Sequence, residues 1–329
     1  AAIRDHQVQL LRAADVDVDI DHALTDDLAG ELGVFRIHRG RTAIAWGAGG
    51  SLVMLALLPH LAVILQSFAG RWFFSILPQE WTTAHFTEVF GHGLTASSIR
   101  NSLFYATIAV LIDLVLGLLI GYLIVRTRLW GRGLLDALSM LPLAVPGLVM
   151  AFGYVAMTLK WPFTDWTNDQ GEVVVEALLP WINVIGADPN PIPLLIIAYA
   201  VRRLPYVVRA TVAGLQQTSG ELEEAALNLG AGRICAVRTI IVPLIAANLI
   251  AGGLLAFSFA MLEVSDSLIL ALREEHFPIT KAIYVLFERL GDGLYIASAM
   301  GVWGMALLTV TLVGATILLG KKLGAIFKV

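Results

Sequence analysis

Six long apolar stretches follow one another along this chain. They run roughly over residues 44–67, 102–125, 137–158, 192–215, 243–265 and 296–320. A helix needs about 20 apolar residues to cross the hydrocarbon core of a bilayer. Lipid offers backbone groups no hydrogen-bond partner, so continuous apolar runs of this length cross it as helices. The sequence therefore predicts an all-α membrane protein whose six transmembrane helices occupy residues 42–329 and face the lipid bilayer.

Composition supports this class and excludes others. Hydrophobic residues make up 57% of the 329 residues and charged residues only 15%, whereas soluble domains carry about a quarter charged residues. The net charge of −4 comes without a strongly basic face, so we expect no nucleic-acid partner. The single cysteine, Cys235, excludes an internal disulfide and a cysteine-based metal cluster. We expect no metal and no cofactor on this chain.

The first 41 residues differ in character from the rest of the chain. Four aspartates alternate with Val and Ile over residues 15–21, and three arginines lie between residues 36 and 41. An acidic run of this kind can bind a cation, but the glycine turn and loop spacing of a calcium site are missing, which favours a solvated strand or linker. We interpret residues 1–41 as a cytoplasmic acidic extension or linker. The start without Met indicates a fragment of a longer polypeptide.

Basic residues predict the orientation of the spans, because Lys and Arg in short loops stay on the cytoplasmic side. They gather before the first span, between the second and third, before the fifth and after the sixth: Arg36, Arg39, Arg41, Arg126, Arg128, Arg132, Arg233, Arg238, Lys321, Lys322 and Lys328. The loop over residues 159–190 is acidic instead. Six spans with both chain ends in the cytoplasm fit this pattern.

The loop between the fourth and fifth spans, residues 218–243, has the pattern of an ordered helical hairpin. Thr218 and Glu221 have the spacing of a capping box, and Gly230 supplies a helix stop. A second short helix then leads to Pro243, near the start of the fifth span. We expect a helix, a glycine turn and a helix on the cytoplasmic face.

This loop resembles the EAA loop of ATP-binding-cassette (ABC) importer permeases. Glu224-Ala225-Ala226 is followed after three residues by Gly230 and after nine more by Ile240-Ile241-Val242-Pro243, with Val242 where the family pattern has Leu. The resemblance implies the type I ABC importer permease fold, in which the loop docks in a cleft of an ATPase subunit. The residues that it assigns to coupling are Glu223, Glu224, Ala225, Ala226, Gly230, Arg233 and Pro243. A helical hairpin with a purely structural role is the alternative.

Further stretches extend the resemblance over most of residues 44–329 and favour the ferric-iron-type branch. They are the segments 101–103, 141–147 and 203–209. That branch also resembles permeases for polyamines and aminoalkylphosphonates, which stay open as alternatives to ferric iron. Many ferric-type permeases carry two six-helix halves on one chain, and the acidic leader looks like the linker before a second half. In that case the other half would be fused to this chain. If it is a separate chain, it would be identical to this one or homologous.

ATP hydrolysis is expected on a partner chain. The nearest approach to a phosphate-binding loop, from Gly314 to Lys322, has one residue too many and lacks the hydroxyl. ATP and Mg²⁺ would therefore belong to the ATPase subunit, and this chain would be no enzyme. The resemblance further implies a substrate-binding protein that delivers the solute.

Charged side chains within spans are costly and are therefore candidates for the translocation pathway. Asp113 lies about as far into the second span as Arg202 and Arg203 lie into the fourth, so the three should reach similar depth. We expect an ion pair between Asp113 and one of these arginines; arginines that snorkel or face water are the alternative. An ion-coupled secondary transporter using Asp113 and Arg202 is the second functional hypothesis, although we find no internal repeat.

Two further groups are pathway candidates. Pro142, Pro146 and Gly147 should break the third span, and such breaks can line a route with backbone groups, although prolines also occur in structural helices. Glu263 and Asp266 lie at the outer end of the fifth span, where they could gate access from a binding protein. A solvated helix end is the alternative.

Small residues within the spans predict close packing, and no catalytic group accompanies them. Gly117 and Gly121 form a GxxxG pair, and Gly252-Gly253 lies in the fifth span. The seven histidines are scattered, and no arrangement of nucleophile, base and orienting group is visible.

Overall fold

The computed structural model describes residues 39–326 except 73 and 187. The predicted acidic run over residues 15–21 and the basic Lys328 lie outside these residues. The chain divides into two units, Ala1–Leu61 and Ala62–Val329. The predicted boundary at residue 41 stays a prediction.

Within the first unit, the described residues belong to one helix. α3 runs from Arg39 to Ser67 and so ends inside the second unit. Large apolar side chains are exposed along it, among them Trp46 and Leu52. The stretch Trp46–Ser67 is long and apolar enough to cross a membrane, which confirms the helix predicted over residues 44–67.

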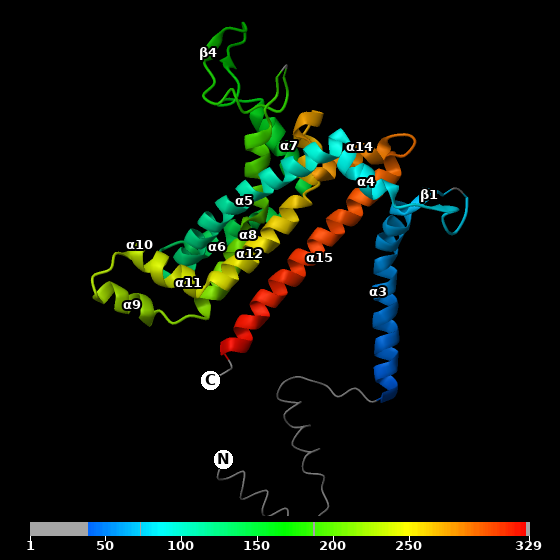
Figure 1. Ribbon diagram of the computed structural model, residues 1–329. Coiled ribbons are helices and arrows are strands. Elements are labelled where there is room, and N and C mark those ends of the chain that lie inside the picture. Colours follow the sequence, from blue (N-terminus) through cyan, green and yellow to red (C-terminus); the bar gives the residue numbers. More distant parts are fainter. Residues whose placement is uncertain (1–38, 73, 187, 327–329) are drawn as a thin grey trace, which may run out of the picture. The chain divides into compact units, whose positions relative to one another are not determined.

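Long helices lie together in the second unit (Figure 1): α5 (Gly93–Arg126), α8 (Ile192–Gln216), α12 (Ala246–Met261) and α15 (Gly293–Ile326). α5 packs along α8, α12 contacts both of them, and α15 packs against α12. The predicted glycine packing is confirmed. A Cβ atom at Gly117 would lie 2.6 Å from Val207 Cγ1, and one at Gly121 would lie 2.6 Å from Thr211 Cγ2. Both contacts advance by four residues on each helix, so α5 and α8 run parallel.

Two helical segments are sharply bent. The helix axis bends by 101° between α6 (Arg132–Ala144) and α7 (Gly147–Thr158). The backbone is extended at Val145, and Pro146 caps α7, which confirms the predicted break in the third span. Pro142 lies inside α6, before the bend.

The second bend separates the segment after the hairpin from α12. The chain passes from α10 (Arg233–Ala236) through the π-helix η1 (Val237–Ile241) to α11 (Val242–Leu244). The helix axis then bends by 76° between the segment Arg233–Leu244 and α12. Because proline lacks a backbone N–H, Pro243 fits the first turn of α11.

Short elements join the long helices. The hairpin of β1 (Ala69–Arg71) and β2 (Glu80–Trp81) precedes α4 (Ala84–Gly91), and that of β3 (Trp166–Thr167) and β4 (Val173–Val175) lies between α7 and α8. α9 (Glu221–Asn228) follows α8, while α13 (Ser265–Leu270), the 3₁₀ helix η2 (Glu274–His276) and α14 (Ile279–Glu288) follow α12. Both sheets are two-stranded and antiparallel, and they leave the helical class unchanged.

Side chains of α5 fasten the segment before α14. The Asn101 amide donates to the carbonyls of Glu275, at 2.8 Å, and Phe277, at 3.2 Å. The Ser102 hydroxyl oxygen accepts from the N–H of Ile279 at 2.7 Å. Both side chains are buried, so they satisfy backbone groups that the helix bundle would otherwise leave unpaired.

Length and composition allow several of the described helices to cross a membrane. α3, α5 and α15 qualify singly, and the count reaches five if each bent pair is one span. α8 has 25 residues but carries three arginines. Large apolar side chains such as Val115 are exposed along α5, as expected of a helix that contacts lipid. An all-α membrane protein is therefore confirmed, whereas the total of six spans and the cytoplasmic location of both ends stay predictions.

Candidate functional site

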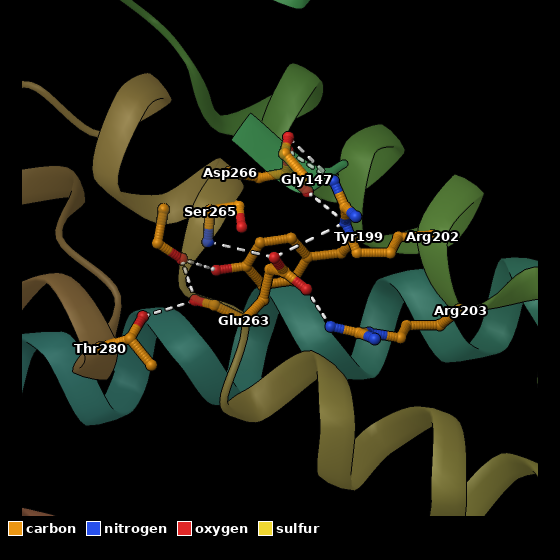
Figure 2. A network of polar contacts seen from close by, with 9 residues as sticks. Gly147, Tyr199, Arg202, Arg203, Glu263, Ser265, Asp266 and Thr280 are labelled. Atoms are coloured by element: carbon orange, nitrogen blue, oxygen red, sulfur yellow. Dashed lines mark hydrogen bonds and ion pairs between the residues drawn. The ribbon is translucent and has the colours of Figure 1, made fainter. Parts of the chain in front are cut away.

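Two arginines and two acids meet inside the helix bundle. Arg202 Nε lies 3.0 Å from Asp266 Oδ2 and 3.6 Å from Glu263 Oε1, and Arg203 pairs with Glu263 Oε2. Figure 2 shows the arginines reaching from α8 toward acids on α13 and on the break that precedes it. Asp266 is fully buried and Glu263 nearly so. We call Arg202, Arg203, Glu263 and Asp266 the charge cluster.

The break between α12 and α13 provides the backbone groups around the charge cluster. The hydroxyls of Ser267 and Thr280 donate to the carbonyl of Glu263 at 2.5 and 2.6 Å, and the N–H of Ser265 donates to the Glu263 carboxylate at 3.2 Å. The hydroxyls of Tyr199 and Ser267 lie 2.6 Å apart. Side chains thus form hydrogen bonds with the backbone at the break, where the regular helical hydrogen bonds are missing.

The break in the third span meets the same cluster. Arg202 Nη2 donates to the carbonyl of Gly147 at 3.1 Å (Figure 2). A Cβ atom at Gly147 would lie 2.7 Å from Ser265 Cβ and 3.1 Å from Arg202 Nη1. Only glycine therefore lets α7 approach the break before α13 this closely.

The expected ion pair between Asp113 and an arginine is wrong. The α5–α8 contacts place Asp113 level with Arg203, one turn before the contact of Gly117 with Val207. Both arginines turn instead to Glu263 and Asp266, which the break carries into the bundle. Asp113 is fully buried, and within the described residues neither of its carboxylate oxygens has a hydrogen-bond partner.

The structure brings most of the pathway candidates together. Gly147 and the charge cluster are in contact, and Pro146 adjoins them, whereas Pro142 and Asp113 lie outside these contacts. A solvated end for Glu263 and Asp266 is wrong, because both are buried. Sequence reasoning missed Tyr199, although it precedes Arg203 by four residues on the same helix. Its only signal was this helical spacing.

The predicted helix, glycine turn and helix are confirmed between α8 and α12. α9 ends at Asn228, and Gly230 adopts φ = +92°. The N–H of Gly230 donates to the carbonyl of Leu227, and that of Ala231 to the carbonyl of Ala226, both at 3.0 Å. This is the Schellman arrangement, which favours glycine at the left-handed position.

The predicted capping box is wrong. Gly220 is the N-cap of α9, and as glycine it has no side chain with which to cap the helix. The Thr218 hydroxyl donates to the carbonyl of Leu215 at 3.1 Å and accepts from Arg126 Nη2 at 2.9 Å. It is the Ser219 hydroxyl oxygen that accepts the N–H of Glu221, at 3.2 Å. The Thr218 hydroxyl, which the motif assigns to capping α9, is thus bound by Arg126 instead.

The residues expected to contact an ATPase subunit differ in exposure. Glu224, Ala225, Gly230, Arg233 and Pro243 are exposed and Ala226 is half-buried. Glu223 is buried at 8% exposure, although the next residue, Glu224, is exposed. Exposed apolar side chains flank the glycine turn, with Leu229 at 90% and Ile234 at 85% exposure. Within the described residues, no group of three or more His, Cys, Asp or Glu could hold a metal ion.

Broken spans, intramembrane charges and an ordered hairpin between two long helices are features of a transport protein of the membrane. The profile of the family described as "Binding-protein-dependent transport system inner membrane component" matches residues 113–320. The chain belongs to this family.

Relatives and a solved structure agree with this family. The chain is 28% identical over 264 residues to the "Ferric transport system permease protein FbpB" of Actinobacillus pleuropneumoniae, covering 77% of this chain and 34% of that protein. It is 30% identical over 196 residues to the "Molybdenum transport system permease protein ModB" of Escherichia coli (strain K12), covering 59% and 80%. The chain thus spans about a third of the length of the ferric relative.

A solved bacterial ABC transporter involved in the import of the acidic polysaccharide alginate has a similar fold. The superposition has a TM-score of 0.57 at 16% sequence identity and covers 86% of this chain and 98% of that one. The likeness confirms the type I ABC importer permease fold that the EAA loop implied.

Proposed function

We propose that this chain forms a membrane-spanning half of an ABC importer. A separate binding protein would deliver the solute, and ATP hydrolysis with Mg²⁺ on a partner ATPase subunit would drive transport. Membership of the family and the helical hairpin between α8 and α12 support this proposal. The other half would be fused to this chain, identical to it or homologous.

The surface of the hairpin is the observation that carries the proposal. Leu229 and Ile234 expose large apolar side chains around the glycine turn. On the first turn of α9, Leu222 exposes an apolar side chain, and Glu221 and Glu224 expose carboxylates. Such a mixture of apolar and charged side chains is typical of a surface that another protein covers. Its position between two long helices means that a push on the hairpin would act directly on α8 and α12.

The charge cluster supports a role in gating the pathway. It joins α8 to two helix breaks, one before α7 and one before α13. Two positive and two negative charges balance there, so the cluster can persist inside the bundle. Separating the breaks from α8 would uncover backbone and charged groups that a polar solute can follow.

The proposed cargo is ferric iron. The similarity to the ferric permease covers 77% of this chain, more than the 59% covered by the molybdenum permease. Molybdate or another small oxyanion is the principal alternative, followed by polyamines and aminoalkylphosphonates.

Co-purification with the ATPase subunit encoded beside the gene tests the coupling surface. The full-length protein is compared with Leu229→Asp and Ile234→Asp, which should lose the ATPase subunit because a carboxylate replaces apolar contact. Leu290→Asp is the matched control, since Leu290 is 95% exposed and lies between α14 and α15, away from the hairpin. Retention of the subunit by all three variants would refute the assignment of the surface.

A second comparison uses the backbone of the turn. Gly230→Val forces a branched residue into φ = +92°, whereas Gly232→Val places it at φ = −69°, and at neither position would the added Cβ atom lie within 4 Å of another atom. Gly230→Val alone should weaken co-purification. Uptake of radioactive ferric iron and of molybdate into proteoliposomes that also contain the ATPase and binding protein then identifies the cargo.

A further inference from the structure

Glu223 faces into the protein, although it lies in the segment expected to contact the ATPase. It occupies the first turn of α9 beside Glu221 and Glu224. Those two carboxylates are exposed, whereas Glu223 is buried. The EAA segment therefore has two faces, and Glu223 belongs to the inner one.

Two side chains at the end of α5 hold the Glu223 carboxylate. The Tyr122 hydroxyl donates to Glu223 Oε1, and Arg126 Nε lies 3.8 Å from Glu223 Oε2. Tyr122 and Arg126 are four residues apart, so they lie on one face of α5. The Arg126 and Glu223 side chains are 17% and 10% exposed, which limits the competition of water for the pair.

Arg126 also binds the chain that leads into α9. Its Nη2 donates to the carbonyls of Leu215 and Thr218 at 3.2 and 2.8 Å, and to the Thr218 hydroxyl oxygen. These acceptors lie at and just beyond the end of α8, before α9 begins. One arginine of α5 thus fastens the loop before α9 and the first turn of α9 together.

These contacts connect the hairpin to a helix that is not its neighbour in sequence. The chain itself joins α9 to α8 and, through α10 and α11, to α12. α5 is linked to α9 by side chains alone, and it packs on α8 through Gly117 and Gly121 at a separation that leaves no room for a Cβ atom. Motion of the hairpin would therefore carry α5 and α8 together.

We infer that Glu223, Tyr122 and Arg126 are positioning residues that latch the coupling hairpin to α5. The inference rests on the proposed function and deepens it. Glu223 acts through Tyr122 and Arg126 inside this chain, while Glu224 is the carboxylate that meets the ATPase subunit. When the latch is intact, the hairpin and the end of α5 move as one body. When it is broken, the hairpin moves and α5 lags behind.

The test measures the distance between the hairpin and the end of α5. Nitroxide labels are placed on Cys235, the chain's single and exposed cysteine, and on Leu129→Cys, just beyond α5. The full-length protein with its ATPase subunit is compared without nucleotide and after trapping with ATP, Mg²⁺ and vanadate. With the latch intact, the distance should be the same in both states. In Glu223→Gln and Tyr122→Phe it should shift on trapping.

Glu224→Gln is the matched control, because it removes the same charge from the neighbouring position on the exposed face. It should weaken co-purification of the ATPase subunit and leave the label distance constant in the complex that remains. Glu223→Gln should instead keep the ATPase subunit and shift the label distance on trapping. The double variant of Glu223 and Tyr122 should shift no further than Glu223→Gln alone, because the Tyr122 hydroxyl reaches the hairpin only through the Glu223 side chain.

The outcomes separate the latch from the proposed function. If the unmodified protein binds no ATPase subunit, the proposed function fails. If it binds the subunit and Glu223→Gln keeps a constant distance, the latch is refuted. Loss of the ATPase subunit from Glu223→Gln would refute it equally, by showing that Glu223 contacts the partner.

Discussion

The contact between α5 and α8 predicts a large difference between two Gly→Ala substitutions. In Gly117→Ala, the new Cβ would lie 2.6 Å from Val207 Cγ1 and 2.9 Å from Val207 Cβ. Carbon atoms in contact lie about 3.5–4.0 Å apart, so the helices must separate by about 1 Å. Val207 is β-branched and stiff, and it cannot turn aside. Gly153→Ala is the control, since Gly153 also lies within a helix and its Cβ meets nothing within 4 Å.

Helix propensity favours Ala equally in both variants and cancels in the comparison. Overpacking costs about 1–3 kcal/mol, so Gly117→Ala should be less stable than Gly153→Ala by about that amount. The free energy of unfolding is measured by titration with SDS in mixed micelles, followed by tryptophan fluorescence. Adding Val207→Ala removes the Cγ1 contact and should restore part of the loss, and the remainder reflects the Cβ atom of residue 207 at 2.9 Å, which alanine retains. Equal stability of the two glycine variants would refute this account of the packing.

Three further predictions concern charged side chains. Asp266→Asn leaves Arg202 without its nearest acid and should destabilise the fold by about 3–5 kcal/mol. Asp136→Asn removes a partly exposed pair with Arg209 and should change the unfolding free energy by about 1 kcal/mol or less. Asp113→Leu should raise stability by about 1–3 kcal/mol, because the buried carboxylate has no hydrogen-bond partner among the described residues; a loss of that size would contradict this. Lys281 lies outside the helices suited to cross a membrane. Burial lowers its pKa below 10.5, so the charged form of Lys281 weakens the fold. The stability of the unmodified protein relative to Lys281→Met should therefore rise with pH between the lowered pKa and 10.5, and a constant difference would contradict this.

Local patterns were enough to predict the helical class, the glycine contacts and the break at Pro146. Each depends on residues that are close in sequence, such as the GxxxG spacing of Gly117 and Gly121. Proline and glycine impose their effects on the backbone wherever the chain later packs. These features could therefore be recognised without knowing which helices become neighbours.

Partner choice could not be predicted in the same way. Depth along two spans placed Asp113 level with Arg203 but said nothing of the acids that a third segment offers. The break before α13 brings Glu263 and Asp266 to the arginines. The capping box at Thr218 failed for a similar reason, because Arg126 lies 92 residues away in sequence and occupies that hydroxyl. Long-range side-chain contacts overrode both local expectations.

The uninterrupted length of α5 makes the protein sensitive to the thickness of its membrane. Its 34 residues correspond to about 51 Å of helix, against about 30 Å of hydrocarbon core. A helix this long must tilt or extend beyond the core, and its tilt adjusts to bilayer thickness. Tyr122 and Arg126 stand in its last turns, so a change of tilt displaces the groups that hold α9. Acyl-chain length would thereby set the resting position of the hairpin surface that we propose contacts the ATPase subunit.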